Sequence, residues 1–147
     1  MVRVRKGLLV LIAAGALAGI LALTVGPVSQ NRALDEFLHV LQSAASAAGL
    51  PEPSERAAEM LANVLLFVPL GLAGGWLAPL RRAPWVVTGL GLLALLVEAV
   101  QYPVAGRDAS LRDVLLNASG GVLGVVAAVL VRRTVRVVRT ARASPSA

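Results

Sequence analysis

The chain has 147 residues, of which 57% are apolar and 15% are charged, and it contains no cysteine. An ordinary soluble domain has about 45–50% apolar and about 25% charged residues. This composition disfavours a soluble enzyme and a nucleotide-binding fold, and the lack of cysteine disfavours a disulfide-stabilised secreted scaffold.

Long segments without charge indicate the class of protein. Residues 7–31, 60–80 and 114–131 carry no charge, and residues 83–106 carry only Glu98. A helix needs about 20 apolar residues to cross the ~30 Å hydrocarbon layer of a membrane. The sequence therefore predicts an all-α membrane protein, a small bundle of four transmembrane helices at residues 7–25, 57–80, 84–103 and 113–131.

The basic residues predict the orientation of this bundle. Ten of the fourteen would lie on one side of the membrane: Arg3, Arg5, Lys6, Arg81, Arg82, Arg132, Arg133, Arg136, Arg139 and Arg142. Short loops with excess Lys and Arg stay in the cytoplasm, so we expect both termini there, with residues 1–6 as a basic N-terminus. Residues 132–147 would form a basic tail, disordered at its end. Because the charge lies beside the apolar segments, the net charge of +6 does not indicate a nucleic-acid partner.

The first apolar segment has two interpretations. Its basic start is also typical of a cleaved signal peptide. However, its apolar stretch exceeds the usual length of about 7–15 residues, and no A-x-A site follows it. We therefore expect a retained first helix.

The predicted outer loop, residues 26–56, contains an amphipathic segment. Its apolar residues follow the spacing of one helix face: Leu34, Phe37, Leu38 and Leu41. Such a helix either lies along the outer membrane interface or packs on its neighbours in the loop. His39 is the single histidine of the chain and does not indicate a metal site.

Glycine pairs four residues apart predict close helix contacts. They are Gly15 with Gly19, Gly71 with Gly75, and Gly120 with Gly124. We interpret them as contacts within one bundle rather than as a dimer motif.

Three predicted helices carry polar pairs that share a face: Glu59 with Asn63, Glu98 with Gln101, and Asp113 with Asn117. All three pairs lie toward the outer ends of their helices, beside a loop that contains Arg107. A carboxylate within a membrane is costly without a partner, so Glu98 is expected to pair with Arg107. The sequence predicts a polar recess that faces outward and holds an amide, hydroxyl or phosphate headgroup, although the same residues could form a network that only fixes the bundle.

Catalysis has little support from these residues. Glu98 and Asp113 would need separated pKa values to act as acid and base. No Ser–His pair, metal-ligand cluster or phosphate loop accompanies them. We predict no metal and no cofactor.

Two segments resemble the VanZ family. Residues 62–71, ANVLLFVPLG, are similar to its N-x-x-L-F-x-P-L-G pattern through Asn63, Phe67, Pro69 and Gly71. Residues 97–124 resemble its E-x-x-Q, R, D-x-x-x-N-x-x-G signature, and the matching positions are Glu98, Gln101, Arg107, Asp113, Asn117, Gly120 and Gly124. The resemblance covers residues 57–131. Ser110 stands where family members often have Asp.

The resemblance implies a multi-pass protein of the bacterial cell membrane, because VanZ-like proteins are integral membrane proteins. The founding member is tied to low-level resistance to teicoplanin-type glycopeptides. The outward-facing recess predicted from the polar pairs suits an envelope role, and we expect it to bind a lipid-linked envelope component or the lipid anchor of a lipoglycopeptide. Two alternatives stay open: an intramembrane enzyme acting on a lipid headgroup through Glu98 and Asp113, and a structural partner subunit of a membrane complex. The sequence does not predict the oligomeric state.

Overall fold

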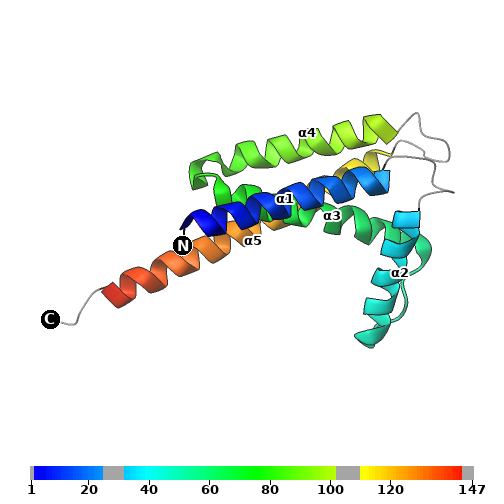
Figure 1. Cartoon of the computed structure of the whole chain (residues 1–147), viewed down its shortest axis with the longest axis horizontal. Coiled ribbons are helices and arrows are strands. Elements are labelled where there is room, and N and C mark those ends of the chain that lie inside the picture. Colours follow the sequence, from blue (N-terminus) through cyan, green and yellow to red (C-terminus); the bar gives the residue numbers. More distant parts are fainter. Residues whose placement is uncertain (1, 25–31, 102–109, 144–147) are drawn as a thin grey trace.

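The computed structural model describes residues 2–24, 32–101 and 110–143, and every regular element in these ranges is helical. The elements are α1 (Val2–Thr24), α2 (Arg32–Ala47), α3 (Glu55–Leu77), the short 3-10 helix η2 (Leu80–Arg82), α4 (Ala83–Gln101) and α5 (Leu111–Ala143). The four longer helices run along a common axis, and α2 lies across one end of them (Figure 1).

The two ends of the bundle differ in the elements that form them. We call the end with α2, the starts of α3 and α5 and the end of α4 the polar end. The opposite end, with the start of α1, η2 and the last part of α5, is the basic end (Figure 1).

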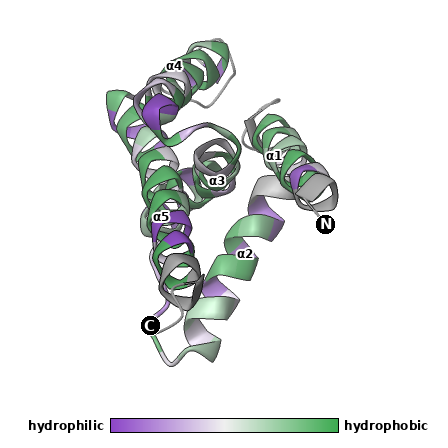
Figure 2. Ribbon diagram, turned by 90° about the vertical axis from the view of Figure 1, so that its left-hand side faces the viewer, coloured by the Kyte–Doolittle hydropathy of each residue, from purple (hydrophilic) through white to green (hydrophobic). Residues whose placement is uncertain are grey.

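Three helices are long and apolar enough to cross a membrane: Glu55–Leu77, Leu80–Gln101 and Leu111–Val138. A shorter apolar stretch, Lys6–Ala22, stands where the first crossing was predicted. Large apolar side chains are exposed on every one of these helices. Figure 2 shows that hydrophobic residues predominate along them. Such an exterior suits lipid rather than water. The length and composition of these helices confirm the prediction of an all-helical, multi-pass membrane protein.

α3 is the central helix, because it contacts α1, α2, α4 and α5 (Figure 2). Its most extensive contact is with α5. The contact points advance together along both helices: Val64 faces Gly120, and Gly75 faces Ala128. α3 and α5 are therefore parallel. α4, which lies between them in the sequence, runs in the opposite direction. Pro69 lies inside α3 without ending it.

Glycines let the backbones of α3 and α5 touch. A Cβ atom added to Gly71, Gly120 or Gly124 would overlap a backbone carbonyl oxygen of the facing helix. Small residues are the usual means of such close approach in lipid, so the predicted pairs on these two helices are confirmed. The predicted pair on α1 is wrong: a Cβ added to Gly15 or Gly19 would meet nothing within 4 Å.

α2 ends in a left-handed glycine turn. Gly49 has a φ of 70°, its N–H donates to Ser46, and the N–H of Leu50 donates to Ala45, both at 2.9 Å. This pattern satisfies carbonyl groups at a helix end. α3 then begins after Ser54, whose hydroxyl accepts the N–H of Ala57 at 3.3 Å.

The amphipathic stripe of α2 rests partly on α3. Phe37, Leu38 and Leu41 are half-buried, and α2 contacts α3. The Leu34 side chain lies outside the described part. These contacts favour the alternative in which α2 packs on another part of the protein. The transverse direction of α2 (Figure 1) also suits a helix that lies along the membrane interface.

α5 continues far beyond its predicted end at residue 131 and reaches Ala143. It is helical at residues 140–143, where we predicted disorder, and residues 144–147 lie outside the described residues. The extension projects beyond the end of α3 (Figure 1).

Candidate functional site

Three polar side chains are buried near the polar end of the bundle. Glu98 and Gln101 on α4 are 7% and 9% exposed, and Asn117 on α5 is 4% exposed. The first two lie in the last turn of α4, and Asn117 lies in the second turn of α5. The packing of α3, α4 and α5 therefore brings together residues from two of the three predicted polar pairs.

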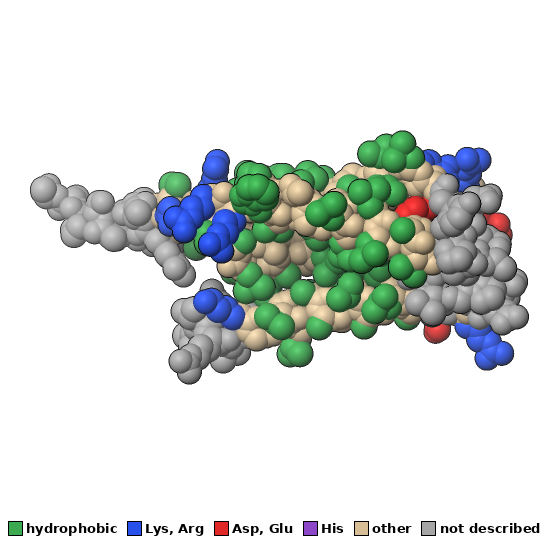
Figure 3. Space-filling view, turned by 90° about the horizontal axis from the view of Figure 1, so that it is seen from above, with side chains coloured by type: hydrophobic (Ala, Val, Ile, Leu, Met, Phe, Trp, Pro, Cys, Tyr) green, Lys and Arg blue, Asp and Glu red, His purple; other side chains and the backbone are tan. Residues whose placement is uncertain are grey.

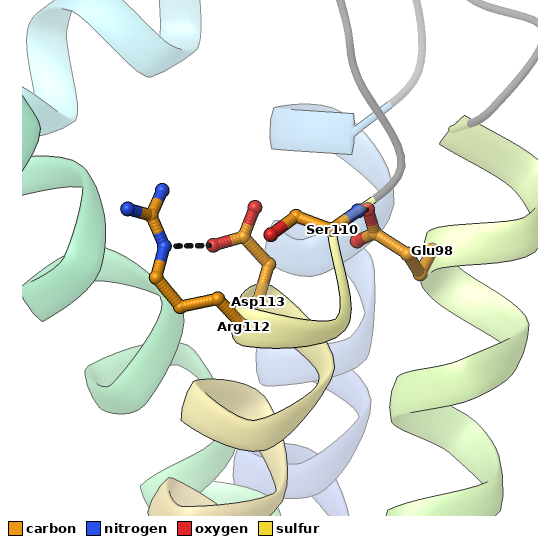
Figure 4. Close-up of polar contacts among 4 residues, drawn as sticks. All are labelled: Glu98, Ser110, Arg112 and Asp113. Carbon is orange, nitrogen blue, oxygen red and sulfur yellow. Dashed lines mark hydrogen bonds and ion pairs between the residues drawn. The ribbon is translucent and has the colours of Figure 1, made fainter.

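Glu98 reaches the start of α5. Its Oε1 accepts a hydrogen bond from the backbone N–H of Ser110 (Figure 4). The carbonyl of Ser110 in turn accepts the N–H groups of Asp113 and Val114, at 2.9 and 3.2 Å, so Ser110 is the N-cap of α5. The first N–H groups of a helix lack partners within it, and this end carries the positive pole of the helix dipole. The carboxylate of Glu98 thus caps α5 from a neighbouring helix.

The predicted partner of Glu98 was Arg107, which lies outside the described residues. The hydrogen bond to Ser110 was not predicted. A sequence signal for the start of α5 was present, because Ser110 followed three residues later by Asp113 is typical of a helix N-terminus.

Asp113 lies in the first turn of α5, where an acidic side chain complements the helix dipole. Its Oδ1 is 3.6 Å from Nε of Arg112 (Figure 4), and the two side chains are 25% and 43% exposed. Exposed ion pairs of this kind contribute about 0–1 kcal/mol. Asp113 therefore has a local partner at the edge of the site.

An apolar layer lies directly beneath the polar side chains. Its buried members are Ile20, Phe67, Ala94 and Val97. On α3, Asn63 lies one turn before Phe67, and on α4, Glu98 and Gln101 lie one turn after Ala94 and Val97. Residues one turn apart share a helix face. We call Asn63, Glu98, Gln101 and Ser110 the polar layer.

Asn117 lies deeper than the polar layer. Its helix neighbour Val114 packs against the apolar layer. The next turn of α5 faces both neighbouring helices, since Gly120 contacts α3 and Gly121 contacts Leu90 of α4. The side chain of Asn117 has no hydrogen-bond partner among the residues that the structure describes.

The other motif residues serve packing, or lie at the margin of the site. Phe67 is 1% exposed within the apolar layer. Gly71, Gly120 and Gly124 form the α3–α5 contact described above. Asn63 is half-buried, whereas Glu59, its predicted companion, is exposed.

Arg132 is a structurally important residue that sequence analysis assigned only to the basic tail. Its Nη1 donates to the carbonyls of Gly75 and Ala78, at 2.5 and 2.7 Å. These carbonyls lie at the C-terminal end of α3, where backbone acceptors lack partners within the helix. No local pattern marks this role, because it depends on the register between α3 and α5.

Within the described residues, no group of three or more His, Cys, Asp or Glu side chains is placed to hold a metal ion.

The fold and the buried polar layer define a multi-pass helical membrane protein with one polar site between its helices. A family model described as VanZ/LLP1 matches residues 13–132, and the chain belongs to this family. The match extends the resemblance seen in residues 57–131 to the second half of α1 and to α2. No curated protein and no solved structure matches the chain.

Proposed function

We propose that the chain crosses the bacterial cytoplasmic membrane four times, with both termini in the cytoplasm and the polar end outside. The exposed basic residues Lys6, Arg81, Arg82 and Arg133 belong to elements of the basic end. On the face in Figure 3, acidic side chains lie at the other end, beside further Lys or Arg side chains. The described basic residues of that end, Arg32, Arg56 and Arg112, are fewer than the acidic residues there. This asymmetry supports the orientation, because short cytoplasmic loops are rich in Lys and Arg.

We further propose that the polar layer binds the headgroup of a lipid-linked envelope component, or the lipid-bearing part of a lipoglycopeptide. The observation that supports this most is the burial of Glu98 and Gln101 of the polar layer, and of Asn117 beneath it, among helices with apolar exteriors. Polar residues inside a membrane protein are costly, and an ionisable residue there, such as Glu98, is a candidate for a functional site. Binding at the outer leaflet would change susceptibility to teicoplanin-type antibiotics.

The test is antibiotic susceptibility in a glycopeptide-sensitive Gram-positive host at matched membrane levels of each variant. We expect the wild-type protein to protect against teicoplanin more than against vancomycin. Glu98→Gln and Arg107→Ala should lose this protection. Glu59→Gln is the matched control for Glu98→Gln, because it makes the same chemical change on an exposed side chain at the same end.

Two results would contradict the proposal. Full protection by Glu98→Gln would exclude the polar layer as the functional site. The absence of protection by the wild-type protein would exclude the resistance role.

A further inference from the structure

The packing of the bundle leaves the burial of Asn117 unexplained. Its side chain is 4% exposed and has no hydrogen bond in the part of the chain that the structure describes. A buried polar group without a partner destabilises the fold. An apolar residue at this position would pack without that cost, so packing alone does not account for the amide.

Asn117 lies on the α5 face that bears the site. Asp113 precedes it by one turn at the edge of the polar layer, and Gly121 follows it by one turn against Leu90 of α4. Gly120 lies beside it against α3. The amide therefore faces the space between α3 and α4, beneath Glu98 of the polar layer.

The charges above Asn117 indicate which ligand group fits there. Glu98 and Asp113 place two carboxylates at this end, and the cation of Arg112 lies at the edge with Asp113. A phosphate group entering this space would meet like charges, which oppose binding. A neutral group avoids that repulsion.

The chemistry of asparagine narrows the ligand further. Its amide presents a donor and an acceptor side by side, and a second amide satisfies both at once. We propose that Asn117 pairs with a neutral amide in the head of an amphiphilic ligand, either the acetamido group of an amino sugar or a peptide amide. This inference rests on the proposed function and names the ligand chemistry of the same site.

The test uses thermal unfolding of the purified full-length protein in a maltoside detergent, followed by the fluorescence of Trp76 and Trp85. The probes are the octyl glycoside of N-acetylglucosamine and octyl glucoside, which differ at the acetamido group. A third probe, N-octanoyl-alanine amide, carries a peptide-type amide. A ligand that binds only the folded state raises Tm. We expect an amide-bearing probe to raise the Tm of the wild-type protein by several degrees more than octyl glucoside does, and the probe that acts identifies the sugar or the peptide source.

The decisive variant is Asn117→Leu, which keeps a similar volume and removes the amide. Without a probe, its Tm should exceed that of the wild-type protein, because an unpartnered polar group has been removed. With the active probe, its Tm should not rise. Ser119→Ala, an exposed change on the same helix, should retain the wild-type response.

Three outcomes would overturn the inference: a lower probe-free Tm in Asn117→Leu, a retained response in that variant, or a wild-type response to octyl glucoside as large as the response to each of the two amide-bearing probes. The proposed function is judged separately by loss of protection in Glu98→Gln. If that loss occurs while Asn117→Leu responds normally, the site is supported and the amide assignment fails.

Discussion

Glu98 and Arg132 lie toward opposite ends of the bundle, and each completes the hydrogen bonding at the end of a neighbouring helix. Glu98 accepts the N–H at the start of α5, and Arg132 donates to two carbonyls at the end of α3. Both charges have the sign that complements the helix dipole at that end. Within a membrane, unpaired backbone groups are especially costly, so these two side chains allow α3 and α5 to end near lipid.

Arg132 provides a prediction about stability. Arg132→Met retains much of the aliphatic stem but removes both hydrogen bonds, and it should lower the free energy of unfolding by about 2 kcal/mol. Arg133→Met removes the same charge from the adjacent, exposed position and should change it by less than about 0.5 kcal/mol. Denaturant unfolding in detergent micelles measures both values. Equal losses in the two variants would show that net charge, rather than the contact with α3, is responsible.

For individual residues, local sequence patterns predicted part of the candidate site. The spacing of Glu98, Gln101 and Asn117 placed buried polar residues correctly, because residues one turn apart share a face. The role of Arg132 could not be predicted in this way, since it contacts residues 54 and 57 positions earlier in the chain. That contact depends on the register of two helices, which no local pattern specifies.

Among the elements, the pair α3 and α5 has the most extensive contact. Its glycines leave no room for side chains, because the carbonyl oxygens of Val64, Val68 and Gly121 occupy the space that a Cβ would need. α1, in contrast, offers open space at both of its paired glycines. Glycine spacing predicted the close approach on α3 and α5, but it also predicted one on α1 that is absent, because spacing alone does not specify whether another helix faces the glycines.

This difference gives a matched pair of variants. Gly120→Ala should force α3 and α5 apart and lower the free energy of unfolding by about 3 kcal/mol, at the upper end of overpacking costs. Gly15→Ala adds the same methyl group in open space and should be neutral or slightly stabilising. The yield of monodisperse protein after detergent extraction, together with unfolding curves, measures the effect. A large loss from Gly15→Ala would reveal an interface on α1.

The end of α2 supports a prediction about a single turn. Gly49 has a positive φ. A residue with a Cβ atom is less stable in that backbone conformation by about 1–2 kcal/mol. Gly49→Ala should therefore loosen the last turn of α2. Hydrogen exchange should quicken for the amides of Gly49 and Leu50, while the amides of α4 serve as an internal control. Unchanged protection at Leu50 would argue against the glycine turn at the end of α2.

For the whole molecule, composition and charge predicted the class of fold well, because the need for about 20 apolar residues per crossing leaves few alternatives. The length of α5 was not predicted, because its arginines and valines were interpreted as a tail beyond the membrane. Arginine is a good helix former, and valine is tolerated in a helix. The segment therefore continues as helix once α5 has begun.

The proposed orientation can be tested with single cysteines, because the parent chain has none. Ser43→Cys places a thiol on the exposed side of α2, and Arg133→Cys places one at the basic end. A membrane-impermeant maleimide should label the first variant in intact cells and the second only after permeabilisation. The reverse pattern would invert the topology and place the polar layer in the cytoplasm.

The direction of α3 and α5 also determines when they can meet. Because the two helices are parallel, α4 must carry the chain back across the membrane before α5 can reach α3. About 50 residues separate the facing glycines Gly71 and Gly121, which corresponds to several seconds at about 5–20 residues per second of synthesis. Throughout that interval the face of α3 that will contact α5 is available to other helices in the membrane. The synthesis of α5 is thus the step that completes the main helix contact of the newly made protein. If translation stops before α5 has been made, the released chain lacks its contact between α3 and α5.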